Sequence, residues 1–382
     1  MFCVKRQVVQ TFWVKRELRI TDIVLMIDKN TNKNWRLVMK QYLLPETGNF
    51  YKANMHTHTV CSDGIYTPEE IKEHYKSHGY SVVAYTDHDV MIDHSDLNDE
   101  SFLAITSYEI ETNSISIGNS FTATHCYHLN FYAPVPNQTD YVCPNPSYCF
   151  KNAPKYAAQQ DYYKGDYIRR YSVEGQNEMI AEARAKGYLV SYNHPDWSLQ
   201  NYSDYIGLEG ITAVEVYNTG CVVGGFVLDK GDHVLDHFLK AGKRIYPVAT
   251  DDCHGNNDMC GGWVRFKADA LTYDNILNAY AKGNFYASWG PEMESLYMEN
   301  GVLKMDFPAD SHVASVEVHT AVRWVVRRNG TDMIHAEIDL NDYMNEIKSI
   351  GFPIDRAYFR VIVTDDKGNK ALTRGYFLDE LE

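Results

Sequence analysis

Strand-like and helix-like segments alternate along the chain between about residues 51 and 291. Short apolar runs typical of buried strands occur at 81–86, 102–109, 126–132, 188–193, 213–218 and 244–250. Helical segments are indicated at 67–79, 173–185, 232–241 and 273–282. The first of these has a capped start, since Thr67 can cap, Pro68 suits the first turn and Glu70 completes a capping box. Repeated strand–helix units predict a parallel sheet or a barrel.

The two ends of the chain have a different pattern. Residues 1–50 alternate apolar and polar side chains around a polar turn at 28–34, which predicts a β hairpin or edge segment. After Pro291 the helical signal almost disappears, and β-branched and aromatic runs alternate with turn signals such as Asn329-Gly330. We therefore expect three parts: residues 1–50, a barrel over 51–291 and a small all-β domain over 292–382.

Composition excludes several classes of protein. With 36 Lys+Arg against 51 Asp+Glu, the net charge of −15 argues against binding along nucleic acid or an anionic membrane. The 45% of apolar residues argues against a disordered chain. No run is long and apolar enough for a membrane span or a signal peptide, so we expect a soluble cytoplasmic protein. The eight cysteines form no Cys-x-x-Cys pair, and we expect reduced thiols.

Residues 134–170 form a long, weakly periodic segment rich in Tyr, Pro and Asn. Such a loop is either a functional lid or locally disordered. Its basic residues are either a phosphate clamp or a solvated charge cluster: Lys164, Arg169 and Arg170. Its tyrosines either stack on a base or sugar or pack within the protein: Tyr141, Tyr148, Tyr156, Tyr162, Tyr163 and Tyr167, with Tyr171 just beyond.

Histidine and carboxylate residues occur at the ends of successive strand candidates. His56 and His58 are separated by one residue, so both imidazoles project from the same side of an extended chain. Similar groups follow in or after the later strands: Asp63, His88, Glu109, His128, His194, Asp252 and His254. The C-terminal ends of parallel barrel strands converge on one face, so these side chains are expected to meet. Ligands of this type and number suit two or three Zn, Mn or Fe ions.

The motifs that carry these residues are NMHTHTVCSDG, TPEE, AYTDHD, SYEIE, YHLNFYA, SYNHPDW and TDDCHG. In this order, over roughly residues 51–290, they resemble the PHP family, named for polymerase and histidinol phosphatase domains. The resemblance implies a distorted (β/α)7 barrel with a two- or three-metal site that hydrolyses phosphoesters. The layout after Pro291 resembles bacterial PHP proteins that carry a C-terminal, Ig-like β sandwich and have phosphatase-like, nuclease-like and amide-hydrolysing relatives.

The resemblance also implies a ligand set for each metal. The first metal is expected to bind His56, His58, Glu109 and Asp252. Glu109 is expected to bridge to a second metal held by His128 and His194. The third site would consist of Asp63, His88 and His254. A hydroxide that bridges two metals is the expected nucleophile. Asp252 would accept a proton, and His194 or His254 would stabilise or protonate the leaving oxygen.

Other residues compete for some of these roles. Each alternative lies close in sequence to the preferred ligand: Glu111 to Glu109, His125 to His128 and Asp251 to Asp252. Asp87 and Asp89 are expected to orient a ligand histidine rather than bind metal. The remaining histidines are expected to be solvated or structural: His74, His78, His94, His233, His237, His312, His319 and His335.

These observations together favour a metal-dependent phosphoesterase of the EC 3.1 class that cleaves a small phosphomonoester or phosphodiester. An amide or carbamate hydrolase using the same metals is the first alternative, and a metal-dependent binding module is the second. We expect a small phosphorylated substrate as partner, no membrane and no extended nucleic acid, and leave a homo-oligomer open. In the C-terminal part, four aromatic residues are expected in the core rather than on a sugar platform: Trp324, Tyr343, Tyr358 and Phe359.

Overall fold

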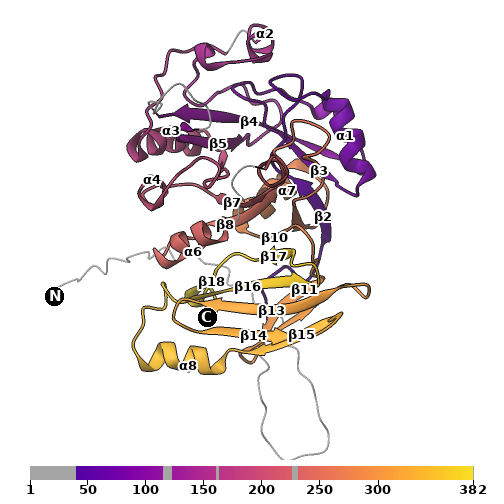
Figure 1. Cartoon of the computed structure of the whole chain (residues 1–382), viewed down its shortest axis with the longest axis vertical. Coiled ribbons are helices and arrows are strands. Elements are labelled where there is room, and N and C mark those ends of the chain that lie inside the picture. Colours follow the sequence, from indigo (N-terminus) through magenta and orange to yellow (C-terminus); the bar gives the residue numbers. More distant parts are fainter. Residues whose placement is uncertain (1–39, 115–122, 161–162, 226–230, 382) are drawn as a thin grey trace, which may run out of the picture.

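The computed structural model describes residues 40–114, 123–160, 163–225 and 231–381. It has mixed α/β architecture built on one large, twisted sheet and a second, smaller sheet (Figure 1). From edge to edge, the strands of the large sheet are β14 (Val325–Asn329), β13 (Val313–Thr320), β16 (Tyr358–Asp365), β17 (Lys370–Leu372), β10 (Phe285–Ser288), β9 (Trp263–Ala268), β2 (Asn49–Asn54), β3 (Val82–Tyr85), β4 (Leu103–Asn113), β5 (Cys126–Tyr132), β6 (Leu189–Tyr192), β7 (Ala213–Asn218) and β8 (Tyr246–Thr250). β18 (Tyr376–Phe377) pairs with β16.

The strands of the large sheet do not all run parallel to one another. β2, β3 and β4 are parallel to one another, and so are β6, β7 and β8. β5 is antiparallel to both of its neighbours, and β9 runs antiparallel to β2. The described strands do not close into a barrel, since β8 ends the series. An isolated parallel bridge between Thr57 and Cys253 joins the segments that follow β2 and β8.

The predicted helices are confirmed, and their caps explain why. Thr67 and Glu70 form the expected capping box at the start of α1 (Pro68–Ser77). Ser172 caps α3 (Val173–Ala185) and Thr272 caps α7 (Tyr273–Lys282), which ends at the left-handed Gly283. α6 (Asp232–Lys240) buries one apolar face. A short helix, α2 (Ala153–Ala157), lies in the segment expected as a loop, and two others were not predicted: α4 (Tyr202–Tyr205) and α5 (Thr219–Val223).

The C-terminal part contains the second sheet and a helix. Its antiparallel strands are β1 (Lys40–Tyr42), β11 (Ser295–Glu299), β12 (Val302–Asp306) and β15 (His335–Asp339). The all-β expectation is wrong here, because this part contains the helix α8 (Asn341–Ser349) (Figure 1). Its Tyr343 and Ile347 belong to a buried core that residues of both sheets form. β17 pairs with β10, so the C-terminal strands continue the large sheet. The hairpin predicted for residues 1–50 lies mostly outside the described residues.

Burial tests the expected C-terminal core residues. Tyr343, Tyr358 and Phe359 are buried, as predicted. The prediction for Trp324 is wrong, since its side chain is 38% exposed. The seven cysteines among the described residues are free. None of the described helices has the length and apolar character needed to span a bilayer.

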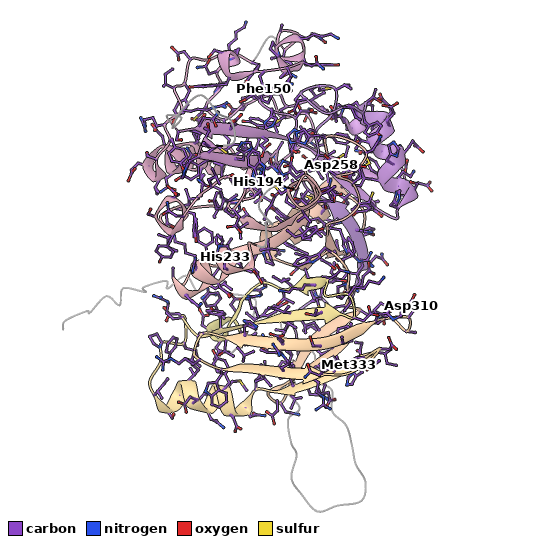
Figure 2. All side chains as sticks on the ribbon, in the orientation of Figure 1. Phe150, His194, His233, Asp258, Asp310 and Met333 are labelled. Atoms are coloured by element: carbon purple, nitrogen blue, oxygen red, sulfur yellow. The ribbon has the colours of Figure 1, made fainter. Side chains whose placement is uncertain are left out.

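The described residues of the segment from 134 to 170 form a packed strap. The Tyr141 hydroxyl donates a hydrogen bond to the carbonyl of Met91 at 2.7 Å, and its ring packs against Tyr163 at 4.3 Å. Both tyrosines are buried. Phe150, at the top of the molecule in Figure 2, lies with its ring 4.9 Å from that of His88. The strap therefore covers one side of the predicted metal-binding residues.

Candidate metal centre

The predicted ligands meet at one edge of the large sheet. His56 and His58 follow β2, His88 follows β3, and His194 follows β6. Asp252 and His254 follow β8 in the same way. His128 reaches this edge for another reason: β5 runs antiparallel, so the edge receives the beginning of that strand and not its end.

Glu109, in the buried middle of β4, lies at the centre of the site. Its Oε1 is 3.3 Å from His56 Nε2, 3.1 Å from His128 Nδ1 and 3.6 Å from His194 Nε2. Its Oε2 is 3.3 Å from His58 Nε2 and 3.4 Å from His88 Nδ1. One carboxylate thus faces five imidazoles, with different histidines at each oxygen.

The first expected ligand group is assembled around Asp252. Its Oδ1 is 3.2 Å from His56 Nε2 and 3.1 Å from His58 Nε2. These two ring nitrogens are themselves only 3.2 Å apart. Two imidazole nitrogens converge in this way either around a shared proton or around a metal ion.

Asp63 and His254 extend the site beyond His58. His254 Nε2 lies 3.4 Å from Asp63 Oδ1, while His254 Nδ1 is 2.8 Å from the carbonyl oxygen of Asp252. A carbonyl can only accept, so Nδ1 carries a proton, and Nε2 faces the Asp63 carboxylate either as a ligand atom or, in the imidazolium, as a donor. His58, Asp63, His88 and His254 form one group whose ligand atoms all lie within 4.8 Å of one another.

Charge coupling among the buried residues of the site is strong. Burial would raise the pKa of Glu109, but His56, His128 and His88 hold it well below its ordinary value. Burial would lower the pKa of His58, but hydrogen bonds with Asp252 and Glu109 raise it to about 10. Burial and the neighbouring His58 lower the pKa of His88 to about 3. The buried carboxylates and imidazoles therefore depend on each other for charge balance.

The donor set fits divalent metals. Nδ1 of His88 and Nε2 of His128 are buried without a hydrogen-bond partner, although each lies on a ring that faces the cluster. Unpaired buried ring nitrogens are rare unless a ligand completes them. Imidazoles and carboxylates together are suitable ligands for Zn, Mn or Fe. Backbone strain marks the same place, because His194 and Asp252 have positive φ angles of 25° and 51°.

The grouping of ligands differs in one respect from the expected sets. His56, His58, Glu109 and Asp252 form one group, as expected. Glu109 and His128 group with His88, whereas His194 groups with His56 and Glu215. Every expected ligand is nevertheless present in at least one group.

The neighbouring alternatives have other positions. Glu111 reaches only His128, at 3.9 Å from Nε2, and none of the other histidines around Glu109. His125 belongs to none of the groups found among the described residues. Asp251 accepts hydrogen bonds from the backbone N–H groups of residues 260, 261 and 262 and from the Thr219 hydroxyl, so it holds the loop after β8.

Asp87 and Asp89 do not orient ligand histidines as predicted. Asp87 accepts hydrogen bonds from the backbone and hydroxyl of Thr59 at 2.8 Å. Asp89 forms a buried ion pair with Arg169, whose Nη1 also donates to the carbonyl of Glu111 at 2.8 Å. Arg169 is therefore neither a phosphate clamp nor a solvated charge. It attaches the strap to the residue that follows His88.

Glu215 is the functional residue that the sequence patterns missed. It is fully buried in β7, and its Oε1 accepts a hydrogen bond from His56 Nδ1 at 2.7 Å. Its Oε2 accepts from the backbone N–H of His194 at 3.0 Å. A signal was present: a glutamate between Val214 and Val216 is a charge inside an apolar strand. Such a charge requires a buried partner.

Glu215→Gln is expected to lower metal affinity about 10- to 100-fold, because the carboxylate fixes the tautomer that points His56 Nε2 into the site. An amide can present its N–H₂ group to Nδ1 and move the ring proton to Nε2. Competition with a chromophoric chelator measures the affinity. The control is Glu209→Gln, since Glu209 is exposed and lies in the loop before β7. Equal affinities in the two variants would contradict the positioning role of Glu215.

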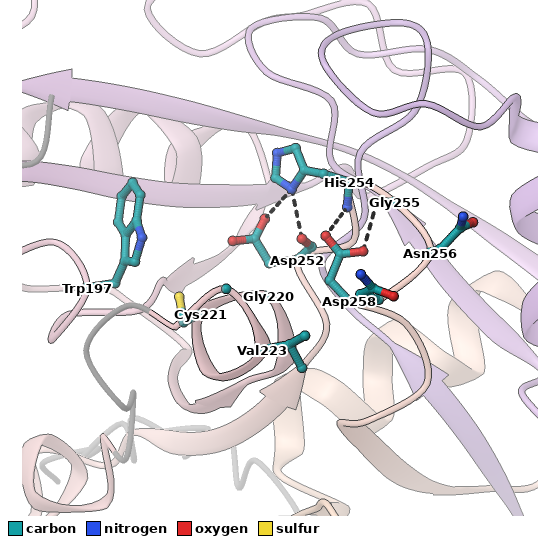
Figure 3. A pocket seen from close by; sticks show the side chains of 11 residues that line it. Trp197, Gly220, Cys221, Val223, Asp252, His254, Gly255, Asn256 and Asp258 are labelled. Carbon is teal, nitrogen blue, oxygen red and sulfur yellow. Dashed lines mark hydrogen bonds and ion pairs between the residues drawn. The ribbon is translucent and has the colours of Figure 1, made fainter.

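A pocket of about 470 Å³ opens beside Asp252 and His254 (Figure 3). Trp197, Val223 and Asn256 contribute to its wall. Its rim is held by Asp258, whose carboxylate accepts hydrogen bonds from the backbone N–H groups of residues 254 and 255 at 2.9 and 2.8 Å. The pocket thus gives access to the metal-binding groups from solvent.

Neither the family models nor the curated proteins include a match to the chain. Among solved structures it is similar to a two-domain protein from Bacteroides vulgatus containing a predicted PHP-like metal-dependent phosphoesterase, at 14% identity and TM-score 0.41, covering 87% of this chain and 98% of that one. It is also similar to an amidohydrolase from Chromobacterium violaceum, at 14% identity and TM-score 0.39, covering 61% of this chain and 96% of that one. A third similar structure is a lesion-specific endonuclease from Pyrococcus furiosus, at 14% identity and TM-score 0.37, covering 61% of this chain and 56% of that one.

Proposed function

We propose that this protein is a metal-dependent hydrolase whose preferred substrate is a small phosphoester. The observation that carries the proposal is the position of Glu109, whose two oxygens lie within 3.6 Å of ring nitrogens from five histidines. A carboxylate placed in this way can join two metal-binding groups. Bound divalent ions would lower the pKa of water and neutralise phosphoryl oxygens during displacement.

Two site residues face the pocket and are proposed to move protons. Asp252 is held by Asn218, whose Nδ2 donates to Oδ2 at 3.3 Å, and we assign Asp252 as proton acceptor. His254 lines the pocket and has a side chain that is 36% exposed, whereas that of His194 is 2% exposed. We therefore assign His254 rather than His194 to the leaving oxygen, and His194 to metal binding.

The pocket supports a small substrate. Its volume of about 470 Å³ lies in the usual range of small-molecule sites, about 300–1,000 Å³. Trp197 stands edge-on to His128 and His194, with ring centroids 5.5 and 4.9 Å away. An aromatic wall next to the ligand histidines suits the organic group of a phosphoester.

The finer description of the fold is also a proposal. We propose that β2 to β8 form an open variant of a distorted seven-stranded barrel, with residues 51–291 as the hydrolase domain. The bridge between Thr57 and Cys253 supports this description. We propose residues 292–382 as a β-sandwich domain with α8 inserted, supported by the core that its two sheets share.

The test is turnover with defined metals. Protein stripped by a chelator and reloaded with Zn or Mn is assayed on an aryl phosphomonoester, an aryl phosphodiester, an aryl carbamate and an anilide. We expect hydrolysis of a phosphoester that is lost on stripping and restored on reloading. Faster carbamate or anilide hydrolysis would support the amide-hydrolysing alternative. Full metal content without turnover on any substrate would support a binding module.

A further inference from the structure

A second set of metal-binding side chains lies beside the candidate metal centre. Cys61, Asp87 and His94 are all buried, and their ligand atoms lie within 4.8 Å of one another. We name this set the thiol cluster. Its members come from the turn after β2, the residues after β3, and the loop before the short 3-10 turn Ser95–Leu97. None of them belongs to the groups around Glu109.

His94 gives independent evidence that this cluster can take a further ligand. Its side chain is only 9% exposed, and Nε2 is buried without a hydrogen-bond partner. The Tyr85 ring packs beside it, with centroids 4.7 Å apart, and offers no acceptor at that nitrogen. A buried imidazole with a free nitrogen, close to a thiol and a carboxylate, has the surroundings of a metal ligand.

Asp87 and Cys61 are held together by one network. Oδ1 of Asp87 accepts from Thr59 N–H and from the Ser62 hydroxyl at 2.8 and 2.7 Å, and Oδ2 accepts from the Thr59 hydroxyl at 2.8 Å. Cys61 N–H donates to the same Thr59 hydroxyl oxygen at 3.0 Å. A carboxylate has about four acceptor positions, so Asp87 retains capacity for one more ligand.

We propose that Cys61, Asp87 and His94 bind one zinc-class divalent ion, separate from the metals held around Glu109. Thiolate combined with imidazole and carboxylate is a zinc-type donor set. Tetrahedral zinc places its ligand atoms about 3.4–3.8 Å apart, so side-chain shifts of roughly 1 Å would close the site. Water would complete the coordination.

The position of the thiol cluster indicates what the ion does. Cys61 lies two residues before Asp63, and Asp87 lies directly before His88. An ion bound by Cys61, Asp87 and His94 fixes two backbone segments. These segments also carry Asp63 and His88, which belong to the neighbouring group of metal ligands. The site is therefore structural, and it supports the third group of metal ligands.

Cobalt titration of the stripped, full-length protein tests the site, because a thiolate ligand gives Co²⁺ a near-ultraviolet charge-transfer band that imidazole and carboxylate do not give. We expect the wild type to develop this band as Co²⁺ is added, with a final intensity that corresponds to one thiolate-bound ion per chain, in addition to the Co²⁺ bound around Glu109. Cys61→Ser should abolish the band and lower the bound metal by one equivalent. Cys143→Ser is the control, because it removes a buried thiol that donates a hydrogen bond to Glu182. This variant should retain the band and the full amount of bound metal.

His94→Gln serves as the second variant, and it should weaken Co²⁺ binding at the thiol site at least about tenfold while leaving Cys61 in place. Circular dichroism confirms that each variant is folded. A wild-type protein without the band, or a band that persists in Cys61→Ser, would overturn the proposal. Neither result bears on phosphoester turnover, which the metal-reloading assay tests separately.

Discussion

Glu109→Gln is expected to lower kcat/KM for the preferred phosphoester about 10³-fold or more, and to lower the metal content of the purified protein. The amide has no negative charge to share between the two sets of histidines, and its N–H₂ group would face ring nitrogens that now face an oxygen. A loss of about 4 kcal/mol in transition-state stabilisation corresponds to this factor. Steady-state kinetics and elemental analysis measure the two effects.

Glu111→Gln is the matched control for this prediction. Glu111 lies two residues further along β4, where its carboxylate accepts a hydrogen bond from Asn113 at 2.7 Å and lies 3.9 Å from His128. We expect less than about a tenfold change in kcat/KM, which is below the loss of about 10- to 100-fold that is typical of a residue orienting a metal ligand. Equal losses in the two variants would assign the bridging role to Glu111 or to both carboxylates. Unfolding curves of both variants separate metal loss from loss of the fold.

Local signals explain which parts of the fold were predictable. α3 and α7 were found with their observed bounds, because Ser172 and Thr272 cap helices whose apolar periodicity is clear. α8 was missed, since Leu340 at its start provides no side-chain cap and its surroundings are rich in β-branched residues. β9 was missed because its alternation of apolar and polar residues follows the glycine-rich loop that carries the last motif.

The direction of a strand could not be deduced from its own residues. β5 is buried along its whole length, as the strands of parallel sheets are, but it pairs antiparallel with both β4 and β6. The expectation that His128 joins the other ligands holds, although the physical reason differs. His128 lies near the beginning of an antiparallel strand, and this places it at the same edge as the ends of the parallel strands.

Long-range partners are the part of the site that sequence patterns do not contain. Glu215 meets His56 across 159 positions of the chain, and Arg169 meets Asp89 across 80. Short motifs identify the candidate ligands because several of these residues lie close together in sequence, for example in His56-Thr57-His58. The residues that orient those ligands are distributed over other strands and the strap, and only the three-dimensional packing brings them to the site.

Arg169→Met is expected to lower the free energy of unfolding by about 3–5 kcal/mol, the usual cost of leaving a buried charge without its partner. The side chains of Arg169 and Asp89 are 3% and 2% exposed, so water cannot replace the guanidinium. Methionine keeps much of the packing volume on the Tyr148 ring, which isolates the effect of charge. Denaturant unfolding of the metal-free protein measures the change.

Arg170→Met supplies the matched control, because this neighbouring arginine pairs with Glu178 where both side chains are at least half exposed. Exposed pairs contribute about 0–1 kcal/mol, so the control should remain close to wild type. The double variant Asp89→Asn/Arg169→Met should recover part of the loss, since no uncompensated charge is left buried. If Arg169→Met cost no more than Arg170→Met, the strap would be held by its tyrosine packing, and the ion pair beside His88 would contribute nothing measurable to the fold.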